Sequence, residues 1–239
     1  GLVKPGDSII FWNFRSDRAR QLTKAFVQGK FNKFKRKKII NLHFVCLTQY
    51  DPDIKAPVAF PPEYITNTLG EVISKNKMRQ FRLAETEKWA HVTFFFNGLS
   101  GKIFDKEDRL LIPSPKASTY DQTPQMSAIP ITKKAIELLN SKKYQFILIN
   151  FANADMVGHT GSLEATVRGI EFLDQKIKEL IDSASANDYA VLLTSDHGNA
   201  EEMVNSNTNS EDTEHNIYPV PLVLIYRDLL KKRKGLSFK

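Results

Sequence analysis

Short runs of β-branched and aromatic residues recur along the chain, and more polar segments with turn-forming residues separate them. Runs of this kind predict β-strands. They occur at residues 8–12, 39–47, 91–96, 145–151, 189–194 and 220–226. Two of them are almost entirely apolar over their central positions, which is typical of strands that helices cover on both faces.

A long amphipathic helix is predicted between the fourth and fifth of these strands. From residue 162 to about residue 187, apolar side chains recur at helical spacing and fall on one stripe. Ser162 can cap the first turn of this helix. Because buried strands alternate with helical segments, the chain is predicted to form an α/β layered fold with a mostly parallel sheet.

A proline-rich segment divides the chain. Residues 50–62 contain four prolines and little hydrophobic periodicity, which favours a linker. We therefore expect a domain boundary near Glu63, with a small amino-terminal piece at residues 1–62 and a larger domain at residues 63–239.

Composition places the chain among ordinary globular proteins. It has 239 residues, of which 41% are hydrophobic and 26% are charged. The single Cys46 cannot form an internal disulfide, and no apolar run approaches the ~20 residues that cross a bilayer. These features predict a reducing, soluble compartment and no membrane partner. Gly1 does not open a signal-like segment, and it suggests a cut or processed end.

Much of the formal net charge of +7 lies in two basic runs, at residues 30–38 and 231–234. Such runs can bind nucleic acid by releasing counterions. No base-stacking motif accompanies either run, so a solvated surface and a loose tail are the preferred interpretation. We therefore expect no nucleic-acid partner.

Carboxylate and imidazole side chains follow two of the predicted strands. Asp155 and His159 come after the fourth strand, Asp196 and His197 come after the fifth, and His215 precedes the last. Ligand sites lie beyond the carboxyl ends of parallel strands, so one sheet edge can gather these side chains. Carboxylate and imidazole suit Mn²⁺, Zn²⁺ or a similar ion, and the spacing does not choose among them.

Two arginines are consistent with a phosphate-containing substrate at such a metal centre. Paired metal ions clamp the attacking and leaving oxygens in phosphoryl transfer and neutralise phosphate charge. Arg15 and Arg18 follow the first strand three residues apart, so on a helix they would share a face and could bind a carboxylate or phosphate. A helix start paired to Asp17 is the alternative that these arginines alone leave open.

Five sequence blocks carry a resemblance to a known family. They are NFRSDRAR at 13–20, ETEKWAHVTFFFNG at 85–98, SPKASTYDQTPQMSA at 114–128, NADMVGHTG at 153–161 and TSDHGNAE at 194–201. In order and spacing they resemble the carboxy-terminal half of the cofactor-independent phosphoglycerate mutases, members of the alkaline phosphatase superfamily. The resemblance implies a three-layer α/β sandwich with a mostly parallel sheet, preceded by the end of a smaller α/β transferase lobe.

The resemblance also implies roles for the candidate residues. Two Mn²⁺ ions would be held, the first by Asp155, His159 and His215, and the second in part by Asp196 and His197. The phosphoglycerate would be bound by Arg15 and Arg18, and its phosphoryl group by Lys88. The enzyme would be a cytoplasmic, glycolytic protein, monomeric at full length, that interconverts 3-phosphoglycerate and 2-phosphoglycerate through a phosphoserine.

The serine nucleophile of the family is not expected in this chain. In the family it lies in an Asn-Ser-Glu-Val-Gly-His stretch which, like the first metal-binding Asp, lies upstream of the residues present here. The similar string Asn209-Ser210-Glu211 lacks the following Val-Gly-His and is rejected as the nucleophile. The isolated chain is therefore predicted to be inactive, with only two expected ligands for the second ion.

Two other functions stay open at this point. The Asp196-His197-Gly198 motif recurs in related metal-dependent phosphatases and phosphopentomutases, although the arginine pair and the Lys88 block disfavour them. The third possibility is a non-catalytic remnant that binds partners through its basic runs, which the intact set of candidate ligands disfavours.

Overall fold

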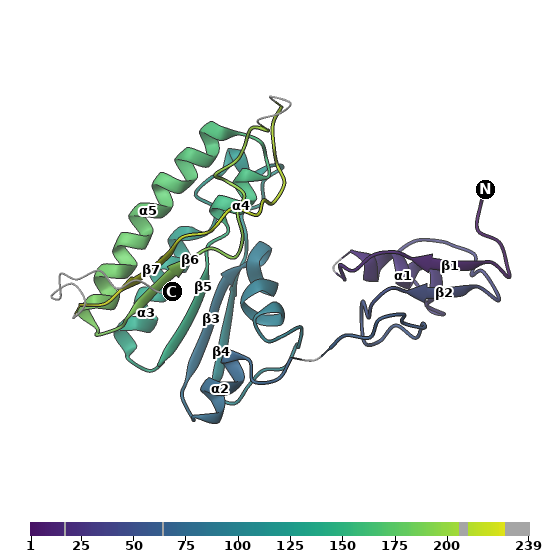
Figure 1. Ribbon diagram of the computed structural model, residues 1–239, viewed down its shortest axis with the longest axis horizontal. Helices are drawn as coiled ribbons and strands as arrows, with labels where there is room; N and C mark the ends of the chain where they lie inside the picture. The colour runs from purple at the N-terminus through teal and green to yellow at the C-terminus, as the bar shows by residue number, and fades with distance from the viewer. Residues whose placement is uncertain (17, 64, 206–209, 228–239) are drawn as a thin grey trace. The chain divides into compact units, whose positions relative to one another are not determined.

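The chain forms two compact units, Gly1–Tyr64 and Ile65–Lys239 (Figure 1). The computed structural model describes residues 1–16, 18–63, 65–205 and 210–227. Each unit has a hydrophobic core of its own. The basic run at 231–234 lies outside the described residues.

The first unit is a small β-α-β arrangement. Strands β1 (Ser8–Phe11) and β2 (His43–Cys46) pair in parallel, and helix α1 (Ala19–Val27) connects them. A parallel pair needs a long crossover connection, which α1 provides. Phe44 and Tyr50 are the largest buried side chains of this unit's core. The predicted strands at both ends of the crossover are confirmed, although β2 is shorter than expected.

The proline-rich segment is part of the first unit. The Cys46 amide donates to the Pro57 carbonyl (2.9 Å), and the Ala59 amide donates to the Cys46 carbonyl (2.9 Å). Val58 packs against the core of the unit. Proline lacks an N–H, but its neighbours retain theirs and can still pair with the edge of β2. The prediction of a linker over residues 50–62 is therefore wrong for most of that segment.

The second unit contains a three-stranded parallel sheet (Figure 1). Its spatial order is β4 (Glu107–Ile112), β3 (Gln80–Glu85) and β5 (Phe146–Asn150). Strands β6 (Val191–Thr194) and β7 (Leu222–Ile225) form a separate antiparallel pair. The predicted mixed α/β fold with a mostly parallel sheet is confirmed.

Helices cover both faces of the three-stranded sheet. Helices α3 (Ala128–Ser141) and α5 (Leu163–Ala186) pack together and share one buried cluster with Phe81 and Leu83 of β3. Helix α5 confirms the helix that the sequence predicts from residue 162. The predicted cap is also present, because the Ser162 hydroxyl accepts the Ala165 amide at the start of α5.

The other face of β3 is polar although it is fully buried. Gln80 donates to the Gly70 carbonyl of helix α2 (Leu69–Lys75), at 2.8 Å. The Arg82 guanidinium lies 4.4 Å from the centre of the Phe96 ring and 3.8 Å from the Glu107 carboxylate. Burial lowers the pKa of Arg82 to about 10, so the side chain stays charged at neutral pH. Helix α2 therefore packs on a face of the sheet that contains the ionic contact between Arg82 and Glu107.

Two strand assignments from the sequence need correction. Strands β3 and β4 are absent from the prediction, because Gln80, Arg82 and Glu107 interrupt the apolar pattern that marks a buried strand. The run at 91–96 is not a strand but begins with the π-helical turn η2 (His91–Phe95), which follows the 3-10 turn η1 (Thr86–Lys88). A short apolar run does not distinguish a strand from a buried helical turn. Among the described residues, the helices are too short or too polar to span a bilayer.

The buried Arg82 offers the first test. Arg82→Ala would remove one of the two cations beside the buried Glu107 carboxylate and leave the partly exposed Arg109 and the Phe104 amide, and we expect the free energy of unfolding to fall by about 3 kcal/mol. Urea unfolding followed by far-ultraviolet circular dichroism measures this loss. Arg168→Ala, which breaks an exposed pair with Glu164, is the matched control and should cost less than about 0.5 kcal/mol. Equal losses in the two variants would show that the buried ionic contact is not structurally important.

Candidate metal centre

Three chain segments bring acidic and basic side chains together at the carboxyl ends of β3, β5 and β6. Lys88 ends η1 directly after β3, and Asp155 lies on the short helix α4 (Asn153–Gly158) after β5. Asp196 and His197 lie in the loop after β6. His215 lies in the segment before β7, where the Asn216 amide donates to the Gly198 carbonyl (3.1 Å) and ties the two loops together.

The first group of side chains is compact. His159 Nε2 and His215 Nε2 each lie 3.1 Å from Asp155 Oδ1, and the two nitrogens lie 3.1 Å from each other. Two ligand atoms bound ~2.1 Å from one ion are about 3.0 to 3.4 Å apart for bond angles between 90° and 109°. The spacing of these three atoms therefore fits a single divalent ion without rearrangement.

Neighbouring groups orient this first group. The His159 Nδ1 atom lies 2.5 Å from the Thr213 carbonyl, an arrangement in which Nδ1 carries the proton and Nε2 remains a ligand. The buried Asn199 donates through Nδ2 to Asp155 Oδ1 (3.1 Å). A side chain at Gly158 would approach the Asn199 amide oxygen to 2.4 Å, so glycine is needed for this contact.

Lys88 connects the two aspartates. Its ammonium lies 2.9 Å from Asp155 Oδ2 and 3.1 Å from Asp196 Oδ2, and its side chain is only 2% exposed. A buried charge requires paired partners, and the two carboxylates provide them. Asp155 thus faces imidazoles through one oxygen and the ammonium through the other.

The local charges shift several pKa values. Burial alone would raise the pKa of Asp155 and Asp196, but Lys88 and the nearby imidazoles outweigh burial and hold both pKa values below the ordinary 3.8. Burial lowers the pKa of His215, with a further contribution from His197. Ionised carboxylates and neutral imidazoles are the protonation states that bind divalent metals.

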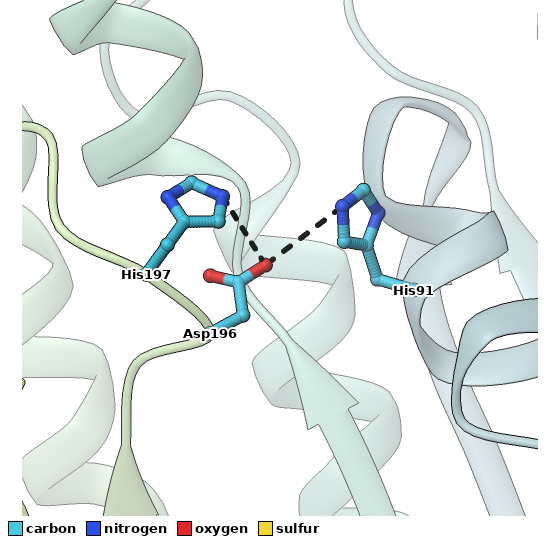
Figure 2. A group of neighbouring side chains, drawn as sticks. All are labelled: His91, Asp196 and His197. Atoms are coloured by element: carbon cyan, nitrogen blue, oxygen red, sulfur yellow. Dashed lines mark ion pairs between the residues drawn. The ribbon is translucent and has the colours of Figure 1, made fainter. Parts of the chain in front are cut away.

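Sequence reasoning missed His91, which lies beside Asp196 and His197. His91 Nε2 is 3.9 Å from Asp196 Oδ2, and His197 Nε2 is 3.6 Å from the same oxygen. Figure 2 shows the two rings on opposite sides of this carboxylate. The available signal was the position of His91 three residues after Lys88, since residues three apart share a helical face. The apolar run that follows led to a strand prediction instead.

The two arginines predicted to bind substrate lie in the first unit. Arg15 is in the loop after β1, and helix α1 begins only at Ala19, with Arg18 as its N-cap residue. The condition under which the two arginines would share a helical face is therefore not met, and their binding of substrate stays a prediction. The loop forms because the Arg15 amide donates to the Asn13 side chain (2.7 Å), which holds the backbone in a turn before the helix.

Comparisons with known proteins agree with a metal-dependent enzyme. Residues 15–237 match the family model described as the Metalloenzyme superfamily, and the chain belongs to that family. It is 51% identical over 223 residues to the 2,3-bisphosphoglycerate-independent phosphoglycerate mutase of Francisella tularensis subsp. novicida. It is 47% identical over 233 residues to the enzyme of the same name from Enterobacter sp..

The match covers most of this chain but less than half of each relative. It includes 93% of this chain and 44% of the Francisella protein, and 98% of this chain and 45% of the Enterobacter protein. A crystal structure of Leishmania mexicana phosphoglycerate mutase at low cobalt concentration superposes with a TM-score of 0.82 at 35% identity. That superposition covers 94% of this chain and 43% of the Leishmania chain.

Replacing the central cation tests the electrostatics of the site. Lys88→Met leaves two neighbouring carboxylates without their cation, and we expect a loss of roughly 1 to 3 kcal/mol in unfolding free energy at pH 7 without divalent ions. In the wild type, the lowered carboxyl pKa values contribute stability above pH 3.8, and this contribution is lost as the pH falls through them. The difference between the proteins should therefore shrink as the pH falls below 3.8. A difference that grows on acidification would contradict this assignment.

Asn199 tests how Asp155 is held. Asn199→Ala removes the amide donor to Asp155, and we expect the affinity for Co²⁺ to fall roughly 10- to 100-fold, the usual effect of losing a group that orients a ligand. Isothermal titration calorimetry gives the affinity. Asn140→Ala is the control, because Asn140 lies near the carboxyl end of α3 and accepts an exposed hydrogen bond from Asn187, the residue that caps the carboxyl end of α5. Unchanged Co²⁺ binding by the Asn199 variant would rule out an orienting role.

Proposed function

We propose that this chain is the carboxy-terminal part of a 2,3-bisphosphoglycerate-independent phosphoglycerate mutase, a cytoplasmic glycolytic enzyme. The observation that carries the proposal is the cluster of Asp155, His159, Asp196, His197 and His215 around the Lys88 ammonium, together with 51% identity to a mutase. The complete protein would act as a monomer on 3-phosphoglycerate and 2-phosphoglycerate.

The two units would have different tasks. The first unit, with Arg15 and Arg18, would belong to the lobe that holds the glycerate portion of the substrate. Guanidinium groups suit this task because they can form paired hydrogen bonds with a carboxylate or phosphate. The second unit would be part of the metal-binding, phosphatase-like domain.

The second unit would contain the groups that neutralise the negative charge of the phosphoryl group. The residues fit divalent ions, which we propose to be Mn²⁺, and such ions would neutralise the phosphoryl oxygens and activate the nucleophile. Asp155, His159 and His215 would hold one ion, and Asp196 and His197 would contribute to the other. The Lys88 ammonium, directed toward the same carboxylates, would pair with a phosphoryl oxygen once substrate is bound.

The relatives are longer than the part that this chain matches, and the catalytic serine is proposed to lie in the other part. The chain spans about 44% of the Francisella relative. Without the serine, the metal centre would have no nucleophile that accepts the phosphoryl group transiently. We therefore propose that the isolated chain has no mutase activity.

Complementation tests this proposal. We expect no conversion of 3-phosphoglycerate to 2-phosphoglycerate by the isolated chain with Mn²⁺, and measurable conversion after co-expression with the amino-terminal part of the Francisella relative. Coupling the product to enolase and measuring absorbance follows the reaction. Asp155→Asn should abolish the restored activity, because it removes one anionic ligand, whereas exposed Asp182→Asn should not.

Two results would contradict the proposal. Turnover by the isolated chain would show that the nucleophile is present within it. A complemented protein that hydrolyses a generic phosphate ester or acts on ribose phosphate in preference to 3-phosphoglycerate would instead identify a related phosphatase or phosphopentomutase.

A further inference from the structure

The formal net positive charge of the chain lies in its first unit. Residues 1–64 contain 12 lysines and arginines but only five acidic residues, whereas residues 65–239 contain 22 basic and 22 acidic residues. Half of the cations of the first unit are concentrated between α1 and β2, at residues 29–41, which we call the basic loop (Figure 1). They are Lys30, Lys33, Lys35, Arg36, Lys37 and Lys38. The proposed mutase function leaves all six without a role.

The charge of the basic loop is not neutralised within the described part of the chain. Its five lysines are exposed, and none of its six cations forms an ion pair with a described residue. The sequence from Arg18 to Tyr50 contains no acidic residue. By contrast, Lys24 of α1 pairs with Asp51. Neighbouring like charges repel one another, so a negatively charged partner would stabilise the loop.

The basic loop has a defined arrangement although it contains no helix or strand. The Arg36 guanidinium donates to the carbonyl of Gln28, the residue that caps the end of α1, and lies 5.2 Å from the centre of the Phe31 ring. The Phe34 ring packs edge-on against Phe31, with ring centres 4.8 Å apart. Phe34 nevertheless remains 58% exposed, and Ile40 is 62% exposed. The arginine therefore holds the loop to α1, while the lysines and two apolar side chains face solvent.

We propose that the basic loop binds the surface of an anionic lipid bilayer. The lysines would contact the negatively charged headgroups, and Phe34 and Ile40 would enter the boundary between headgroups and acyl chains. The expectation of no membrane partner came from the lack of a run that spans a bilayer, and peripheral contact does not need such a run. The inference goes beyond the proposed function and does not rest on it.

Two features of the basic loop favour a bilayer over a nucleic acid. Arginine forms the paired hydrogen bonds that recognise phosphates, but the one arginine in this loop already contacts Gln28 and Phe31. Proteins that bind single-stranded nucleic acid stack successive bases on several aromatic rings, and within residues 29–41 only the Phe34 ring is largely exposed. Exposed lysines beside exposed apolar side chains instead match a bilayer surface, where charge attraction needs no fixed geometry.

Vesicle binding by the complete 239-residue chain tests this inference. We expect the chain to sediment with vesicles of equal parts phosphatidylglycerol and phosphatidylcholine, and not with vesicles of phosphatidylcholine alone. Binding should weaken as sodium chloride is added, because salt screens the attraction between lysines and headgroups. The triple variant Lys33→Gln, Lys35→Gln, Lys37→Gln should bind roughly 100-fold more weakly, since each lysine near an anionic surface contributes about fivefold. Circular dichroism checks that the variant folds.

Matched variants separate the effect of the loop from that of total charge. The control triple variant Lys133→Gln, Lys142→Gln, Lys178→Gln removes three exposed lysines from the second unit and should bind vesicles as the wild type does. Phe34→Ala should weaken binding and retain its dependence on salt, whereas Phe60→Ala, which removes an equally exposed ring outside the loop, should not weaken it. The basic run at 231–234 is present in every variant, so it cannot cause a difference between them.

Several results would overturn this inference. The wild type could fail to bind the anionic vesicles, or bind neutral vesicles equally well, or the two triple variants could lose the same amount of affinity. A fluorescent single-stranded oligonucleotide that binds more tightly than the vesicles, and loses affinity in the loop variant, would identify nucleic acid as the partner instead. None of these results would contradict the proposed mutase function.

Discussion

The Lys88 ammonium, buried between Asp155 and Asp196, is the contact on which the candidate site depends. Lys88 follows β3 and its two partners follow β5 and β6, and among the described residues β6 pairs with β7 rather than with the three-stranded sheet. A buried ammonium is unfavourable unless carboxylates pair with it, and two carboxylates this close are unfavourable unless a cation separates them. Each charge therefore requires the other two, and the requirement fixes the positions of three loops relative to one another.

A similar dependence occurs inside the sheet. The polar face of β3 places Arg82 against Glu107 and against the ring of Phe96, which follows η2. The same strand delivers Lys88 and His91 at its carboxyl end, so the packing of Arg82 positions the start of η1 and η2. The polar residues Gln80 and Arg82 on this face are also the reason that the sequence did not predict β3, because a buried strand is recognised by a run of apolar residues. Among the described residues, most exposed ion pairs join positions three or four apart on one helix, as Arg168 and Glu164 do.

The sequence could predict those parts of the site that follow strong local patterns. Asp155, His159, Asp196 and His197 were found because each pair follows a recognisable apolar strand, and the structure brings them together. His91 was missed because it begins an apolar and aromatic run, and composition alone does not distinguish a π-helical turn from a strand. Asn199 was not selected because an amide is seldom a ligand, and its role depends on contacts with Asp155 that no sequence spacing reveals.

The two groups of ligands differ in how closely they fit an ion. The three atoms of the first group are all 3.1 Å apart, and its His159 ring is fixed by the Thr213 carbonyl. Around Asp196 Oδ2, by contrast, His197 Nε2 lies 3.6 Å away and His91 Nε2 lies 3.9 Å away, and Lys88 contacts the same carboxylate. An ion beside Asp196 would therefore have to draw its ligands together and displace an ammonium, whereas an ion beside Asp155, His159 and His215 would not. From this difference in preorganisation we expect a divalent ion to bind more tightly beside Asp155, His159 and His215 than beside Asp196 and His197.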